Sequence, residues 1–102
     1  VALAEYQRCF QDPATIHGTC EDYRAAATID LIHDQHDQGQ LISCPLLVLW
    51  GNQGIIGRKY DVLDIWRQRA IEVQGNALTC GHFLPEEAPQ ETYQALRKFL
   101  LA

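Results

Sequence analysis

The sequence of 102 residues contains no methionine, and it has only eight lysines and arginines against thirteen aspartates and glutamates. The net charge of -5 argues against nucleic acid and anionic membrane as partners, because both attract basic surfaces. The longest apolar run, residues 45–50, is far too short to cross a bilayer. No charged segment followed by an apolar core opens the chain, so no signal peptide is expected.

The chain also lacks an initiator methionine and a zinc-binding cysteine pattern. It begins inside a predicted helix, which indicates a piece of a longer chain, although removal of a tag gives the same start. The spacings of Cys9, Cys20, Cys44 and Cys80 match no zinc site, and four cysteines allow two disulfides in three connectivities. We expect reduced thiols in a cytoplasmic protein, with Cys20 and Cys44 packed as small hydrophobic side chains.

The first third of the chain predicts helices. Apolar residues at helical spacing indicate a helix over residues 2–10. Asp12-Pro13 is a strong start for a second helix, which is expected to run to about Asp30. Its predicted apolar stripe consists of Ile16, Cys20, Tyr23 and Ala27. Gly18 is expected to mark close packing, and residues 30–43 are expected to form a polar connection with one short helical turn.

The second half alternates between strands and helices. Residues 46–50 form the clearest strand, apolar on both faces as in a central parallel strand, and a loop through Gly57 follows. Asp61 is expected to cap a helix of about ten residues, before a second strand over residues 73–79. The last helix covers residues 89–101, with a predicted buried face of Tyr93, Leu96, Phe99 and Leu100.

This order of elements indicates an α/β fold with a parallel sheet, because strand, helix, strand is a βαβ unit. A sheet of two parallel strands is not expected to stand alone, since such strands are normally covered on both faces and flanked by neighbours. The sequence is therefore expected to be only part of a fold.

His82 is the clearest candidate for chemistry. A strand that ends in Gly81-His82, followed by a proline-rich turn, places the imidazole at the carboxyl edge of the sheet. There it can act as a general base if a carboxylate orients it and an ester faces it. The alternative is a histidine packed under a helix N-terminus.

Other candidates have weaker signals. The loop over residues 51–54 is glycine-rich but carries no nucleotide-binding motif. The ligand types His33, Asp34, His36 and Asp37 are better interpreted as a solvated polar loop than as a metal site, and His17 has no stronger signal. The Tyr23 hydroxyl can donate to an anion or halide, but from the residues alone a core tyrosine is favoured.

Three stretches resemble one family: CEDYRAA at residues 20–26, CPLLVLWG at residues 44–51 and GHFLPEEAP at residues 81–89. The last two resemble α/β hydrolases in general, and the first is similar to the narrower haloacetate (fluoroacetate) dehalogenases. The resemblance covers nearly the whole chain. It implies that residues 1–40 are the end of the helical cap and the return to the core domain, and that residues 41–102 are the C-terminal part of the α/β-hydrolase core.

The resemblance implies a reaction that uses no cofactor and no metal. In these dehalogenases an aspartate displaces halide from the α-carbon of a haloacetate, and water activated by a histidine hydrolyses the ester to glycolate. The catalytic histidine of the family falls on His82. A cap tyrosine that holds the departing halide falls on Tyr23, which reverses the preference for a core tyrosine. Trp50 corresponds to a structural tryptophan at the strand end.

The rest of the machinery is expected upstream of these residues. Many α/β hydrolases place the triad acid near position 54, but Gly54 has no carboxylate. This favours a subgroup whose acid follows the preceding strand, as in haloacetate dehalogenases, over epoxide hydrolases and haloalkane dehalogenases with a late acid. Asp61 is better interpreted as a helix N-cap than as a displaced acid.

The predicted function is therefore that of the C-terminal segment of a cytoplasmic haloacetate dehalogenase-like hydrolase, inactive by itself. Its expected partners are a small haloacid substrate and the N-terminal part of the same protein, and a homodimer stays open. Two alternatives also stay open. One is another α/β hydrolase, such as an epoxide hydrolase or esterase, and the other is a non-catalytic fragment that associates through its exposed strand.

Overall fold

The structure is a computed structural model that describes residues 1–102, and the chain divides into two compact units. Residues 1–38 form the first unit and residues 39–102 form the second. None of the helices combines the length and the apolar character that crossing a membrane requires.

The first unit consists of three successive helices: α1 (Ala2–Phe10), α2 (Pro13–Ala26) and α3 (Ile29–His36). The predicted cap of α2 is confirmed, because the Asp12 side chain accepts a hydrogen bond of 2.9 Å from the Ala14 N–H. No side chain in these helices is buried, so the predicted apolar stripe of α2 is exposed within this unit. The prediction of close packing at Gly18 is wrong, since a Cβ there would meet no atom within 4 Å.

The predicted second helix is broken by Thr28. Helix α2 ends at Ala26, and residues 29–36 form a separate helix instead of one turn in a connection. The N–H groups of Ala27 and Thr28 donate to carbonyls three residues earlier, which tightens the last turn of α2. Thr28 then leaves the helical conformation, with φ -135 and ψ -93, and its hydroxyl donates to the Arg24 carbonyl at 2.7 Å.

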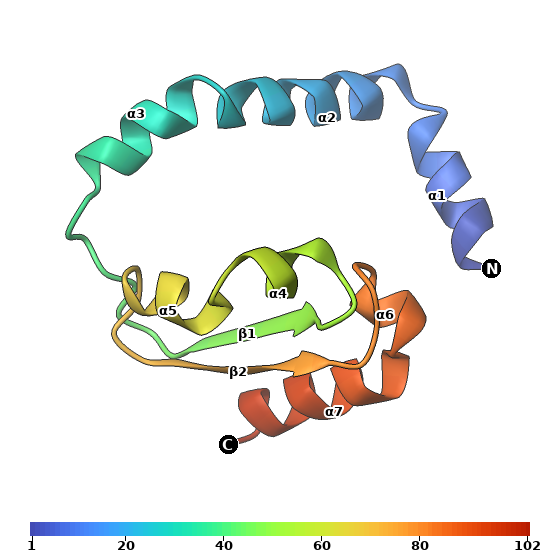
Figure 1. The fold of residues 1–102 in the computed structure, drawn as a ribbon. Coiled ribbons are helices and arrows are strands. Elements are labelled where there is room, and N and C mark those ends of the chain that lie inside the picture. The colour runs from blue at the N-terminus through green and yellow to red at the C-terminus, as the bar shows by residue number, and fades with distance from the viewer. The chain divides into compact units, whose positions relative to one another are not determined.

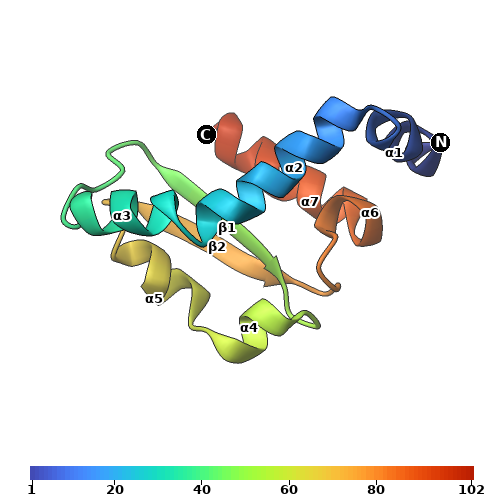
Figure 2. The same ribbon diagram turned by 90° about the horizontal axis from the view of Figure 1, so that it is seen from above.

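The second unit contains two parallel strands, β1 (Leu46–Gly51) and β2 (Val73–Leu78), in the predicted positions (Figure 1). Leu46 lies opposite Val73, and Gly51 lies opposite Leu78. Two short helices lie on one face of the sheet, α4 (Ile55–Lys59) and α5 (Val62–Arg67) (Figures 1 and 2). Helix α7 (Pro89–Leu100) lies on the other face of the sheet (Figure 1). The short helix α6 (Leu84–Glu87) precedes α7 in the chain.

Three details of the second unit differ from the prediction. The loop expected through Gly57 contains α4, and the turn before the last helix contains α6. With five and four residues, these helices are too short to show an apolar period in the sequence. The Asp61 cap is confirmed by a hydrogen bond of 3.0 Å from the Asp64 N–H, but the helix it caps has six residues rather than ten.

The core of the second unit is small. Its buried cluster consists of Leu78, Cys80 and Ala88, with Leu84 packed against them, and Val62 and Ala70 are buried as well. Helix α7 adds Thr92, which is 8% exposed. Of the predicted buried face of α7 only Phe99 is partly buried, and the prediction fails for Tyr93, Leu96 and Leu100, which are 60%, 43% and 72% exposed. These residues belong to one wide apolar face of α7, and this unit covers only the part of that face around Thr92 and Phe99.

Thr92 ties α6 to α7. Its hydroxyl lies 2.7 Å from the Ala88 carbonyl and 3.2 Å from the Leu84 carbonyl. We predict that Thr92→Val lowers the free energy of unfolding by about 1 kcal/mol, because valine keeps the shape and removes the donor. The cost stays modest because both carbonyls keep a backbone N–H partner.

Urea denaturation followed by tryptophan fluorescence measures this change, since Trp50 and Trp66 both lie in the second unit. Thr79→Val is the matched control at an exposed position, and its effect should stay within about 0.5 kcal/mol. Equal effects of the two substitutions would contradict the prediction.

Candidate active site

The two strands end side by side, and hydrogen bonds join the loops that follow them. The Asn52 N–H donates to the Leu78 carbonyl at 2.9 Å, and the Gln53 N–H donates to the Cys80 carbonyl at 3.0 Å. Gly51 is buried, and the Gly81 carbonyl lies directly against it. The loop after β2 is thus held against the end of β1, at the edge where open α/β sheets place their ligand sites.

His82 lies in this loop, as the sequence predicts. Its side chain is exposed, and its ring packs edge-on against Phe83, with ring centroids 5.1 Å apart and planes at 81°. Within this unit, no helix covers the His82 side chain. The imidazole forms no hydrogen bond within the chain, so one ring N–H is free to donate to an acid and the other nitrogen is free to accept from water, as a general base requires.

Glu87 is a residue of this site that the sequence reasoning missed. Its carboxylate accepts hydrogen bonds from the Gly81 N–H at 2.6 Å and from the Phe83 N–H at 3.0 Å. The hydrogen bond from Phe83, then that from Gly81, lowers the pKa of Glu87, with a smaller contribution from the charge of His82 and some opposition from burial. The sequence signal for it is a glutamate soon after a helix start, where a carboxylate often accepts a hydrogen bond from the backbone N–H of the cap residue.

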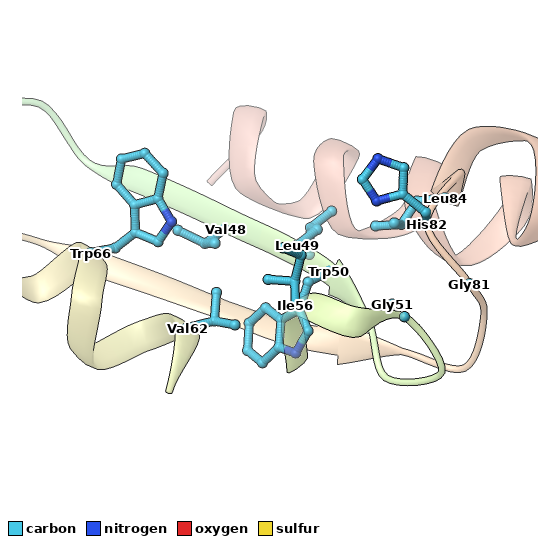
Figure 3. A pocket seen from close by; sticks show the side chains of 11 residues that line it. Val48, Leu49, Trp50, Gly51, Ile56, Val62, Trp66, Gly81, His82 and Leu84 are labelled. Atoms are coloured by element: carbon cyan, nitrogen blue, oxygen red, sulfur yellow. The ribbon is translucent and has the colours of Figure 1, made fainter. Parts of the chain in front are cut away.

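An apolar pocket of about 260 Å³ runs from this loop along β1 (Figure 3). Its end at the carboxyl edge is formed by Gly51, Gly54, Gly81 and His82. The rest of the pocket is lined partly by three consecutive strand residues, 48–50. Because successive side chains of a strand point to opposite faces, a pocket on one face would not contact all three. This part is therefore the edge of β1 that does not pair with β2, and the end near His82 is the part suited to chemistry.

The charged groups at the pocket are few. His82 is the only ionisable residue that lines it, and no carboxylate does, which agrees with the missing acid at Gly54. Cys80 is buried next to the loop, and burial raises the pKa of its thiol, with further contributions from the charges of Glu87 and Glu91. A protonated thiol is a poor nucleophile, so Cys80 does not provide one for His82.

The other predicted candidates lie elsewhere in the chain. Tyr23 belongs to α2 in the first unit and is 76% exposed, so that unit does not bury it, and its halide-binding role stays a prediction. His33 and His36 lie on exposed faces of α3 instead of in a loop. No group of three or more histidine, cysteine, aspartate or glutamate side chains has the arrangement of a metal site.

The four cysteines are unpaired in the structure. Cys20 and Cys44 are exposed, which contradicts the expectation that they pack among apolar neighbours. Cys44 precedes the strand and Cys20 lies in a helix without a covering layer, so neighbours in the sequence do not become neighbours in a core.

Comparison with known proteins places this geometry in a recognised architecture. No family model matches the chain. It is 39% identical over 98 residues to a fluoroacetate dehalogenase from Burkholderia sp. and 32% identical over 98 residues to a soluble epoxide hydrolase from Corynebacterium sp. (strain C12). These alignments cover 96% and 95% of this chain but 32% of each relative, so the chain spans about a third of the length of the curated relatives it matches.

Solved structures agree on the fold and carry different activity names. A candidate α/β hydrolase from Nostoc sp. PCC 7120 matches 97% of this chain with a TM-score of 0.91 and 74% identity, over 34% of its own length. A candidate acyltransferase from Salmonella enterica matches 97% of this chain with a TM-score of 0.89 and 52% identity, over 33% of its length. The chain has the fold of the C-terminal part of an α/β hydrolase.

Proposed function

We propose that this chain acts as the C-terminal third of a haloacetate dehalogenase-like hydrolase, with His82 as its general base. The observation that carries the proposal is the exposed imidazole of His82 at the carboxyl edge of the sheet, in a chain 39% identical to a fluoroacetate dehalogenase. The preceding two thirds would supply the nucleophile, the acid that orients His82 and the groups that bind the substrate carboxylate.

The reaction would proceed in two steps. An aspartate oxygen attacks the α-carbon of the haloacetate, and the carbon–halogen bond breaks with its electron pair on the halide. The Tyr23 hydroxyl would donate a hydrogen bond to the departing halide. His82 then takes a proton from water as the water oxygen attacks the carbonyl carbon of the ester, and it returns a proton to the glycolate oxygen that leaves.

Epoxide hydrolysis is the second candidate, and the 32% identity to a soluble epoxide hydrolase favours it. An aspartate and a histidine can open an epoxide through the same kind of ester, so His82 would keep its task. The absence of a carboxylate at Gly54 weighs against epoxide hydrolases that carry a late acid. An esterase would instead use a serine in a Gly-x-Ser-x-Gly turn.

The proposal extends to the compartment and to the partners of this chain. Four unpaired cysteines are usual in a reducing compartment, which supports a cytoplasmic protein. The unpaired edge of β1 is a place where a further parallel strand would bind, and the rest of the same protein is the partner we propose for it. A homodimer or association with another chain is the non-catalytic alternative.

Fluoride release from fluoroacetate tests the proposed function. The 102-residue chain alone should release no fluoride above the buffer level, because it has no nucleophile at the pocket. The longer protein that contains this chain should release fluoride and form glycolate. The prediction is refuted if the 102-residue chain alone releases fluoride and the His82→Ala substitution abolishes that release.

Two further substrates separate the alternatives. An aliphatic epoxide reports epoxide hydrolysis, and p-nitrophenyl acetate reports esterase activity. If the longer protein turns over either of them but not fluoroacetate, the dehalogenase proposal fails and the corresponding α/β-hydrolase activity replaces it. Size-exclusion chromatography of the 102-residue chain tests self-association, since a clean monomer counts against the homodimer.

A further inference from the structure

We infer that Glu87 is the positioning residue of His82, because its carboxylate holds the peptide N–H groups on both sides of the histidine. The catalytic importance of this contact rests on the proposed function of His82 as a general base. The contact itself does not depend on that function and can be tested without it.

The geometry fixes the loop at two points. One oxygen of Glu87 accepts from Gly81 and the other accepts from Phe83, the two residues that flank His82. The Glu87 N–H also donates to the Phe83 carbonyl at 2.9 Å, so a single residue binds both main-chain groups of Phe83. With the backbone held before and after it, His82 keeps little freedom except rotation of its own side chain.

The chemistry of these bonds selects a carboxylate. An ionised glutamate presents two acceptor oxygens and no donor, whereas a glutamine amide would turn an N–H₂ donor toward one of the two N–H groups. Hydrogen bonds to an ionised acceptor are shorter and stronger than neutral ones. The lowered pKa of Glu87 keeps it ionised at neutral pH, where its negative charge also favours the imidazolium that forms when His82 takes a proton.

Glu87 is not the triad acid in this arrangement. Both of its oxygens bind main-chain N–H groups, and neither forms a hydrogen bond with the imidazole. It therefore acts on His82 through the loop backbone and through its charge. Cys80, whose thiol pKa burial raises, is acted on by the charges of both Glu87 and Glu91 on α7, and the neighbouring Glu86 is a further carboxylate on α6.

The first test needs no substitution. In NMR spectra of the longer hydrolase that contains this chain, the amide signals of Gly81 and Phe83 should titrate together, with a midpoint below the ordinary glutamate pKa of 4.5. Amides that do not donate to a titrating carboxylate should keep constant chemical shifts over the same pH range. Constant shifts for Gly81 and Phe83, or a midpoint at or above 4.5, overturn the inference.

The second test compares Glu87→Gln with Glu91→Gln, a matched loss of one negative charge nearby. In Glu87→Gln, hydrogen exchange of the Gly81 and Phe83 amides should accelerate by at least about tenfold, the effect of losing hydrogen bonds to a charged acceptor. Glu91→Gln should leave both rates within about twofold of the parent chain. Equal rates in the two variants also overturn the inference.

The third measurement connects the contact with catalysis. In the longer hydrolase, Glu87→Gln should lower kcat by about tenfold to a hundredfold, because a small misplacement of a catalytic group has effects of this size. KM should stay within about twofold, since Glu87 does not contact the substrate. A longer protein without turnover overturns the proposed function and leaves the amide tests to decide on the contact, whereas an active protein with unchanged kcat overturns the positioning role.

Discussion

Gly51→Ala is expected to unfold much of the second unit. A Cβ at this position would lie 1.7 Å from the Gly81 oxygen and 2.5 Å from the Cys80 oxygen. These are backbone atoms of the loop that β2 and Glu87 hold in place, so they cannot move aside like the end of a flexible side chain. We expect a loss of about 3 kcal/mol, at the upper end of the usual range for an overpacked site.

Gly54→Ala, three residues further along the chain and just before α4, is the matched control. Its Cβ would lie no closer than 3.3 Å to another atom, and Gly54 has φ -79, which alanine adopts without strain. Its effect should stay within about 0.5 kcal/mol. Urea denaturation followed by tryptophan fluorescence measures both variants in the second unit. If Gly51→Ala is as stable as Gly54→Ala, the loop after β2 does not lie against Gly51.

The parts of the fold that the sequence predicts well are those with local signals. The apolar run of β1 and the Asp12 and Asp61 caps appear where predicted, because their causes lie within a few residues. Burial was predicted less well, since it depends on what covers a face. Leu96 and Leu100 have the right helical spacing for a core, yet this unit places no layer over them.

The candidate site divides in the same way. His82 was predictable because a glycine and a histidine at a strand end, followed by a proline-rich turn, mark an exposed edge position. Glu87 was missed, because a glutamate soon after a helix start indicates at most a hydrogen bond from a nearby cap N–H. Nothing local in the sequence indicates that its carboxylate also accepts from the Gly81 N–H, six residues earlier. The acid that would orient His82 could not be predicted from a chain in which no carboxylate lines the pocket.

His82→Gln should reduce turnover of the longer hydrolase by about a hundredfold to ten-thousandfold, the range for loss of a general base. Under the proposed mechanism the first step does not need His82, so the ester should form and then persist. Intact-protein mass spectrometry after incubation with fluoroacetate should show the added acid group in His82→Gln and little of it in the parent protein. Fluoride release should give a single burst close to one equivalent of enzyme.

The trapped ester separates a general base from a structural histidine. His82 is exposed and forms no hydrogen bond with the chain, so His82→Gln should leave the fluorescence-monitored unfolding transition within about 0.5 kcal/mol of the parent. His17→Gln, at an exposed position on α2, is the control and should keep full turnover. Loss of turnover without a trapped ester would mean that His82 acts before ester formation, and undiminished turnover would remove it from the mechanism. A stable variant that accumulates the ester assigns His82 to the hydrolytic step, because only that step requires a proton to be taken from water.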